Sequence, residues 1–446
     1  MIMIDKILYI DPGTGSMLFS IIIGIAGVLV FAVRALWIKF KFVITGGRSK
    51  ASDSSTMPIC IFSEGKRYWN VFSPICDEFE KRQKDIWYLT ASSDDPALSK
   101  DYKYIHPKFI GEGNKALSKM NLIKADIVLA TTPGLDVYQW KRSKGVKYYV
   151  HIPHMPGDID SYRMLGLDFY DAILLSGQHQ ADRIRKLESI RGIPEKELKL
   201  VGIPYMDKMK ERLDSYTDPE GAGKKEPVVL LAPSWGESGI LSIYGAPFID
   251  LLIKTGYKII IRPHPQSFTS EKDLMDSLMK KYPETDRLKW NRDPDNFDVL
   301  NESDILISDF SGVIFDFTLV FNKPLIYTNV DFDIRPFDAD WIDETPWTLR
   351  ILPDLGIELG EDNVGNIKEL IDKCIDDPSF TEGREKARDE AWGYIGEGAN
   401  RSADFVIEKY NEVVAKKAEE ERKAKTPAKT NSKKKTKKIK VAQKGA

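Results

Sequence analysis

The sequence predicts two α/β domains, each a parallel sheet with helices on both faces, preceded by one N-terminal transmembrane helix. Short β-rich apolar runs alternate with helical patterns along most of the chain, which is typical of parallel sheets. A polar stretch at residues 214–226 separates two series of such runs. Two open α/β domains are expected to face each other across a cleft, with ligands at the carboxyl ends of the strands.

The transmembrane helix is predicted at residues 16–33, SMLFSIIIGIAGVLVFAV, which carry no charge and are long enough to cross a bilayer core of about 30 Å. Arg34 and several lysines follow this stretch, whereas a cleavable signal peptide would carry its positive charge in front of it. The asymmetry predicts a single-pass protein of the cell membrane with its body on the cytoplasmic side. We assign residues 1–47 to the anchor and 48–57 to a polar linker.

Two Rossmann-like domains follow from the order of the strand-like runs. The first series is PICIF, DIWYL, ADIVLAT, VKYYVHI, DAILLS and LKLVGI, and the second is PVVLLAPS, YKIIIRPH, DILISD and PLIYTN. We assign the first series to a domain over residues 58–220 and the second to a domain over residues 221–414. Helical patterns dominate the second domain after residue 362.

The C-terminal residues 415–446 form a separate electrostatic unit. Residues 416–446 hold twelve Lys and one Arg against three Glu, a charge of about +10 in a chain whose formal net charge is -2. Few large apolar residues are present, so we expect a disordered tail that is either simply solvated or docked on an anionic membrane. Binding to nucleic acid is disfavoured, because the remaining chain is acidic and no aromatic residues interleave the lysines.

The sequence does not indicate a metal or another cofactor. The three cysteines show neither CxxC spacing nor an even count, which argues against a disulfide framework and a structural zinc site. Three D-x-D triplets could hold Mg²⁺ on a nucleotide diphosphate: Asp158/Asp160, Asp331/Asp333 and Asp338/Asp340. Such triplets arise readily by chance among 67 acidic residues, so a magnesium requirement stays open.

Arg262 and His264 follow the strand-like run YKIII in the second domain. Pro263 and Pro265 prevent the strand from continuing, so the two side chains are expected on a stiff turn at the carboxyl edge of the sheet. That position suits binding of a diphosphate. Alternatively, Arg262 pairs with a structural carboxylate and His264 caps a helix.

The segment SDILISDFSGVIFDF reads as strand, turn and helix. Asp309 or Ser311 can serve as N-cap, and Gly312 would allow a ligand to approach the backbone closely. The first turn of the helix would then offer N–H groups to a phosphate. Any well-capped helix has the same pattern, so a purely structural role is the alternative.

His151 and His154 end the run VKYYVHI in the first domain, in the segment HIPHMPGD. Imidazoles at this spacing on an extended segment point in different directions, and no third ligand is nearby, which disfavours a metal pair. A histidine with an ordinary pKa near 6.5 can accept a hydroxyl proton. The alternatives are a catalytic base and a structural role for at least one of the two.

Several of these segments together resemble the CDP-glycerol glycerophosphotransferase family, the enzymes that prime and polymerise teichoic acids. The resemblance extends over residues 59–405. Its motifs are VGIPYMD (201–207), LAPSWG (231–236), IIRPHP (260–265), SDILISDFSGVIFDF (303–317) and GANRSADFV (398–406).

The resemblance implies a fold of the glycosyltransferase B type, with the nucleotide bound chiefly by the second domain. It places the donor phosphates and nucleotide near Arg262, Ser234, Ser308, Asp309, Ser311 and Gly312, with His264 as a catalytic residue. The family's other catalytic histidine lies in a His-Gly-Thr motif, to which His151 is nearest by position. HIPHMPGD lacks the Gly-Thr, so the choice between His151 and His154 stays open.

The implied activity is transfer of a phosphoalcohol unit from a CDP-alcohol, CDP-glycerol in the family, to a hydroxyl of a lipid-linked or polymeric acceptor, with release of CMP. A UDP-sugar glycosyltransferase or epimerase of the same fold is one alternative. A membrane-anchored scaffold that works through its basic tail is another. The acceptor, the alcohol transferred and the oligomeric state are not predicted.

Overall fold

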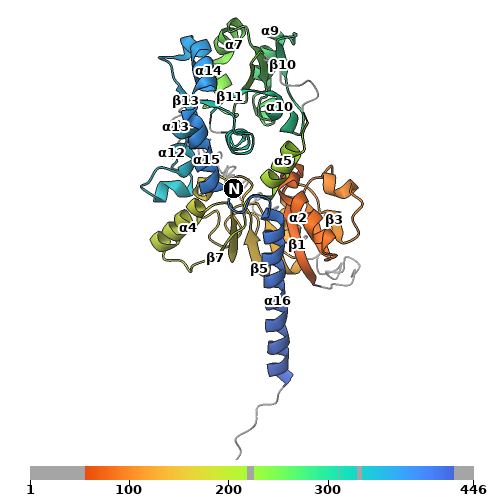
Figure 1. The fold of residues 1–446 in the computed structure, drawn as a ribbon. Coiled ribbons are helices and arrows are strands. Elements are labelled where there is room, and N and C mark those ends of the chain that lie inside the picture. The colour runs from red at the N-terminus through yellow and green to blue at the C-terminus, as the bar shows by residue number, and fades with distance from the viewer. Residues whose placement is uncertain (1–55, 218–225, 310, 329–333, 426–446) are drawn as a thin grey trace, which may run out of the picture. The chain divides into compact units, whose positions relative to one another are not determined.

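The computed structural model describes residues 56–217, 226–309, 311–328 and 334–425. Within these ranges the chain forms two parallel sheets with helices packed on them, which confirms the predicted α/β class (Figure 1). The predicted transmembrane segment at residues 16–33 lies outside the described residues. No helix within them is long and apolar enough to span a bilayer.

The first sheet has seven strands in the order β3-β2-β1-β4-β5-β6-β7, all parallel. Its strands are β1 (Met57–Ser63), β2 (Ile86–Thr90), β3 (Ile105–Phe109), β4 (Lys124–Ala130), β5 (Gly145–His151), β6 (Ala172–Leu175) and β7 (Glu197–Leu200). The helices of this part are η1 (Lys66–Tyr68), α2 (Trp69–Lys81), η2 (Pro96–Ser99), α3 (Asn114–Met120), η3 (Ile159–Ser161), α4 (Gln178–Arg191) and α5 (Pro204–Asp214). The strand order reverses between β1 and β4, so ligands are expected at the carboxyl ends of these two strands.

The central strands carry long apolar runs, which suits a sheet with both faces covered. In β1, Ile59 and Ile61 belong to one core with Phe72 of α2. Cys60 and Phe62, which point the opposite way, belong to a second core with Trp140. This two-sided burial explains the continuous apolar runs in the sequence.

The second sheet has six parallel strands in the order β10-β9-β8-β11-β12-β13. Its strands are β8 (Val228–Leu231), β9 (Lys258–Ile261), β10 (Leu288–Trp290), β11 (Ile305–Ser308), β12 (Leu325–Thr328) and β13 (Gly356–Leu359). The helices are α6 (Ile240–Ile243), α7 (Gly245–Lys254), α8 (Ser267–Ser270), α9 (Lys272–Lys281), α10 (Phe297–Glu302), α11 (Val313–Phe315), the π-helical turn η4 (Asp316–Val320), η5 (Asp338–Trp341), α12 (Trp347–Arg350), α13 (Leu352–Leu355), η6 (Val364–Asn366), α14 (Ile367–Asp376) and α15 (Ser379–Ala391). Here the strand order reverses between β8 and β11.

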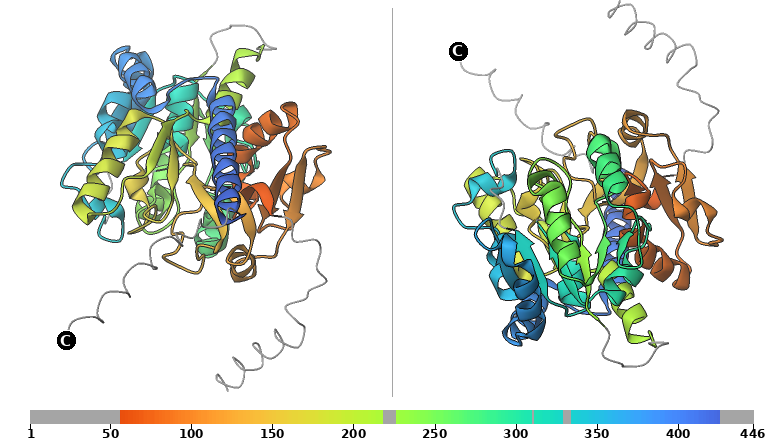
Figure 2. Two further views of the ribbon diagram at one scale, coloured as in Figure 1. Left: turned by 90° about the horizontal axis from the view of Figure 1, so that it is seen from below. Right: turned by 90° about the horizontal axis from the view of Figure 1, so that it is seen from above.

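The last helix, α16 (Gly398–Lys425), packs on α2 and β4 of the first sheet (Figure 2). Phe405 and Val406 lie in the same core as Ile59 and Ile61. The start of α16 is fixed by Asp207, whose carboxylate accepts the Gly398 N–H at 2.8 Å. The sequence assigned residues 398–414 to the second domain, whereas the structure packs this segment against the first sheet.

The helix also continues past the residue at which the sequence predicted a disordered tail to begin. Residues 415–425 are helical because Ala, Glu, Lys and Arg favour helix and because ion pairs support this segment. Lys417 pairs with Asp126, and Lys423 pairs with Glu419 one turn earlier. The prediction for residues 415–425 was therefore wrong, and the rest of the predicted tail lies outside the described residues.

Candidate functional site

His151 is the last residue of β5, and its side chain is fully buried. Its ring packs edge-on against the rings of Tyr162 and Tyr170, with centroid distances of 5.4 and 5.0 Å. The Nε2 atom lies 3.3 Å from the Tyr162 hydroxyl. Burial, together with the neighbouring His154, lowers the pKa of His151 to about 3. His151 is therefore neutral at pH 7, and its side chain has no direct access to solvent.

His154 is partly exposed three residues later, and its Nδ1 atom lies 3.5 Å from the same Tyr162 hydroxyl. Burial and the charge of Arg67 lower the pKa of His154 to about 4. The Tyr162 oxygen thus stands between the two imidazoles. Of the two histidines, His154 is the one that a substrate can reach.

No group of three or more His, Cys, Asp or Glu side chains in the described ranges could hold a metal ion. Of the D-x-D triplets, Asp160 pairs with Arg183 and Asp338 pairs with Arg191. Asp331 and Asp333 lie outside the described residues.

The loop that follows β5 contacts the second sheet in two places. A Cβ atom added to Gly312 would lie 3.5 Å from the sulfur of Met155, the residue after His154. The Asp158 carboxylate accepts the Thr348 N–H at 2.6 Å and the Thr348 hydroxyl at 2.7 Å. The segment HIPHMPGD therefore reaches the turn that follows β11, as well as helix α12.

His264 follows β9 and is exposed. Its Nδ1 atom accepts the Gln266 N–H at 3.1 Å, so the neutral ring carries its proton on Nε2 and can donate it to a ligand. Partial desolvation of the ring and the charge of Arg67 lower its pKa, while Asp309 and Glu271 act in the opposite direction. Nδ1 of His264 therefore binds the residue that precedes α8, close to the structural role given as the alternative. Nε2 remains able to bind a ligand.

Arg262 is partly buried and bonds within the second sheet's own loops. Its guanidinium donates to the Asn291 side-chain oxygen and, at 2.9 Å, to the Asp293 carbonyl. Burial lowers its pKa, and the nearby Asp293 and Asp295 oppose that shift. These bonds hold Arg262 in place and use part of its donor capacity.

Ser308 and Asp309 are fully buried, and both hold the loop after β8 in place. The Ser308 hydroxyl donates to the Ala232 carbonyl at 2.7 Å. The Asp309 carboxylate accepts the Ser234 N–H at 2.9 Å and the Ile240 N–H at 3.1 Å. Burial nevertheless raises the pKa of Asp309. Both residues therefore position Ser234, and neither presents a free group to a ligand.

The predicted helix cap after β11 was wrong. Asp309 bonds to the loop after β8, and the helix begins after Gly312 with no side-chain cap. Helix α11 has only three residues before the π-helical turn η4. Ser311 and Gly312 are partly exposed at this turn, so a ligand would meet a short turn instead of a regular helix end.

Arg67 is a residue that the sequence reasoning missed. It lies in η1, directly after the carboxyl end of β1, and its charge lowers the pKa values of both His154 and His264. The two histidines follow strands of different sheets. The effect of Arg67 on both pKa values means that its charge lies within electrostatic range of both rings. The signal in the sequence was SEGKRYW, a glycine and two cations directly after the first strand-like run.

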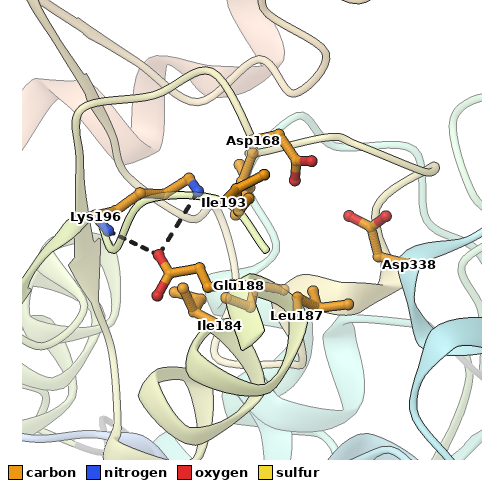
Figure 3. Close-up of a pocket in the computed structure, with 9 residues that line it drawn as sticks. Asp168, Ile184, Leu187, Glu188, Ile193, Lys196 and Asp338 are labelled. Atoms are coloured by element: carbon orange, nitrogen blue, oxygen red, sulfur yellow. Dashed lines mark hydrogen bonds and ion pairs between the residues drawn. The ribbon is translucent and has the colours of Figure 1, made fainter. Parts of the chain in front are cut away.

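Two pockets lie away from these residues. Figure 3 shows one lined by Leu187, Ile193 and Asp338, where Glu188 accepts the Lys196 N–H at 2.8 Å. The other, of about 330 Å³, lies beside the start of α4 and the end of α15. Neither is lined by the candidate histidines or by the residues predicted to bind the donor phosphates, although Asp338 of one D-x-D triplet lines the first.

Comparison with known proteins gives a family match. Residues 161–339 match the model of the CDP-glycerol:poly(glycerophosphate) glycerophosphotransferase family. The teichoic acid glycerol-phosphate primase of Bacillus subtilis (strain 168) is 26% identical over 189 residues, which are 41% of this chain and 45% of that protein. The primase of the same description from Bacillus spizizenii is 27% identical over 188 residues, 40% of this chain and 44% of that protein. These matches span less than half the length of each relative.

Solved structures share the fold. The wall teichoic acid polymerase TagF superposes with a TM-score of 0.53 at 15% identity, over 86% of this chain and 98% of that chain. The UDP-GlcNAc 2-epimerase from Neisseria meningitidis, bound to UDP-GlcNAc, superposes with a TM-score of 0.53 at 13% identity, over 78% and 99%. At these identities the likeness shows a common fold and no more. The family match covers residues 161–339, and over this part the chain is similar to the CDP-glycerol glycerophosphotransferases.

Proposed function

We propose that this chain transfers a glycerol phosphate unit from CDP-glycerol to a hydroxyl of a polymeric or lipid-linked acceptor and releases CMP. The acceptor oxygen attacks the phosphorus that carries the glycerol, and the bond from that phosphorus to the CMP oxygen breaks. The hydroxyl proton passes to His154, and CMP leaves with the electron pair of the broken bond. The partial family match supports the donor class, because the matched family is named for CDP-glycerol and the similar primases carry glycerol phosphate in their names.

One structural observation carries the proposal. The loop bearing His154 contacts the turn at Gly312, and Arg67 acts on both His154 and His264. Groups from both sheets can therefore act on one substrate, with the carboxyl edges of the two sheets facing it. In this arrangement His264 donates its Nε2 proton in a hydrogen bond to the donor phosphates, and preorganised donors of this kind contribute about 2.7 to 4 kcal/mol each.

The proton arrangement around Tyr162 follows from the reaction. For His154 to act as a base through Nε2, its Nδ1 must carry the proton and donate to the Tyr162 hydroxyl. Tyr162 then donates to His151 Nε2, and His151 keeps its proton on Nδ1, a buried atom that has no hydrogen-bond partner among the described residues. That unpaired donor destabilises the folded protein, and we attribute its retention to function.

We further propose that residues 16–33 cross the membrane, that the body lies on the cytoplasmic side, and that the basic tail binds the anionic leaflet. The apolar stretch and the basic residues after it support this topology. Extraction of the full chain from membranes distinguishes binding through the transmembrane segment from electrostatic binding through the basic tail. We expect release by detergent and retention at high salt, while release by salt alone would contradict the transmembrane segment.

The experiment that tests the proposed activity is a panel of nucleotide donors. We expect the full chain to release CMP from CDP-glycerol in the presence of an acceptor, and no UDP from UDP-sugars. Release of UDP from a UDP-sugar, with none of CMP from any CDP-alcohol, would contradict the proposal and favour the chemistry of the epimerases that share the fold. CMP release from CDP-ribitol instead would keep the reaction and correct the alcohol.

A further inference from the structure

Arg67 occupies a position where doubly wound sheets bind ligands. It lies in η1 (Lys66–Tyr68), directly after the carboxyl end of β1, and β1 adjoins β4 where the strand order of the first sheet reverses. The segment that matches the family model begins at residue 161, so this loop lies outside it. Gly65 precedes the turn, and an added Cβ there would meet no other atom within 4 Å. The space beside the loop is therefore open.

Tyr68 contacts both Arg67 and His154. The guanidinium carbon lies 4.8 Å from the centre of the Tyr68 ring. The Tyr68 ring in turn packs edge-on against the His154 ring, with 5.6 Å between the centroids. Stacking on an aromatic ring orients a guanidinium without using its N–H donors. A guanidinium has five N–H donors, so a hydrogen bond to the Tyr68 hydroxyl would still leave several of them for a ligand near the proposed base.

The charge of Arg67 is not neutralised by a side chain. Among the described residues no carboxylate lies within ion-pair distance of Arg67, whereas the adjacent Lys66 pairs with Asp94. Glu64, in the same loop, accepts the Thr132 hydroxyl at 3.3 Å. Arg67 lowers the pKa of His154 and the pKa of His264, as expected of an uncompensated positive charge near both rings. An anion bound here would remove that effect.

We propose that Arg67 binds a phosphate of the acceptor and thereby selects a phosphate-bearing alcohol over a neutral one. The inference rests on the proposed function and adds how the acceptor is recognised. Arg67 and His154 both belong to the first sheet, whereas His264, Arg262 and Ser311 belong to the second. An acceptor hydroxyl must lie beside His154, so the anion nearest to Arg67 is one that the acceptor carries. The planar guanidinium suits a phosphate because it can bind two oxygens at once.

The test compares Arg67→Gln with Lys66→Gln in the full chain. Both variants remove one positive charge from the same loop, but the Lys66 ammonium already pairs with Asp94. With CDP-glycerol as donor, we expect Arg67→Gln to raise the KM for glycerol 3-phosphate as acceptor at least tenfold. The KM for CDP-glycerol should stay within twofold, and the rate with neutral glycerol should not fall, because removal of the Arg67 charge raises the pKa of His154. Lys66→Gln should match the wild type, and Arg67→Lys should restore part of the loss.

Binding of glycerol 3-phosphate can also be measured in the absence of catalysis. Calorimetry with glycerol 3-phosphate alone should give equal Kd values for the wild type and Lys66→Gln, and a Kd at least tenfold higher for Arg67→Gln. In nuclear magnetic resonance titrations, Arg67→Gln should raise the pKa of His264, because a like charge is removed.

Three results would overturn the inference: no binding of glycerol 3-phosphate to the wild type, equal effects of the two glutamine variants, or a raised KM for CDP-glycerol in Arg67→Gln. The last would assign Arg67 to the donor. Failure of the proposed function is distinguishable, because it would appear as absent CMP release by the wild type in every donor assay.

Discussion

At the scale of single residues, Tyr162 connects His151, the last residue of β5, with His154, three residues later. Its hydroxyl lies 3.3 Å from His151 Nε2 and 3.5 Å from His154 Nδ1, so the proton on one ring determines which nitrogen of the other is protonated. A base with a pKa of about 4 is weak at pH 7. An anion on Arg67 would raise that pKa, because it cancels the positive charge that lowers it. Binding of substrate would thus activate His154.

The burial of His151 should make the free energy of unfolding depend on pH in the acid range. Its pKa is about 3 in the folded chain against 6.5 ordinarily, so below pH 6.5 the unfolded chain takes up a proton that the folded chain does not. Stability is therefore lost as the pH falls from 6.5 towards 3, and at pH 5 the loss from this residue is about 2 kcal/mol.

The substitution His151→Gln should remove this part of the acid sensitivity. Denaturant unfolding at pH 7 and pH 5 should show a loss smaller by about 2 kcal/mol in the variant than in the wild type. Equal losses in His151→Gln and the wild type would show that His151 is not buried as a neutral ring.

At the scale of elements, the loop after β5 is held by its bonds to α12. Asp158 accepts two bonds from Thr348, and its own N–H donates to the Thr348 hydroxyl at 3.1 Å. The hydroxyl of Thr348 is thus both donor and acceptor for one residue of the first sheet's loop. This contact fixes the segment between His154 and the second sheet.

Thr348→Val should therefore destabilise the chain by about 1 to 3 kcal/mol, because it leaves the Asp158 N–H and one carboxylate bond without a partner. Thr345→Val makes the same change at an exposed position in the preceding turn and should stay within about 0.5 kcal/mol of the wild type. Denaturant unfolding measures both, and CMP release should fall in Thr348→Val alone. Equal stabilities in the two variants would show that the contact does not hold the loop.

The elements that could be predicted from the sequence are those whose signal is local. The central strands β1, β4, β8 and β11 are buried on both faces and appear as continuous apolar runs. Of the edge strands, β7 was predicted as part of the run LKLVGI, whereas β3, β10 and β13 were missed because their local signal is weak. β3 contains Pro107, β10 has three residues, and β13 begins with Gly356. The docking of α16 on the first sheet depends on partners hundreds of residues away, which no local pattern records.

The same distinction applies to the candidate site. His264 was predicted at a strand end because the prolines beside it are a local signal, and the structure exposes it there. The bonds of Asp309 to Ser234 and Ile240 could not be predicted, because they depend on β8 and β11 being neighbours in the sheet. The position of Arg67 beside His154 likewise depends on how β1 and β5 are arranged in the first sheet.

At the scale of the whole described molecule, contacts between the two sheets recur in several places. Arg163 and Phe337 form an antiparallel bridge, and the Asp338 carboxylate accepts the Leu165 N–H at 2.7 Å while pairing with Arg191. Both sheets reverse their strand order at a central pair, and the candidate residues follow strands near these reversals. The account therefore depends on one claim, that His154 of the first sheet and His264 of the second act on the same substrate.

A double-mutant cycle on CMP release from CDP-glycerol tests that claim most directly. His154→Gln and His264→Gln should each lower kcat/KM about 100-fold or more, since each removes a group that moves or donates a proton in the reaction. Because both act in one step, the double variant should be far less impaired than the product of the two single effects. Independent, multiplicative effects, or wild-type kcat/KM in His264→Gln, would contradict a shared site.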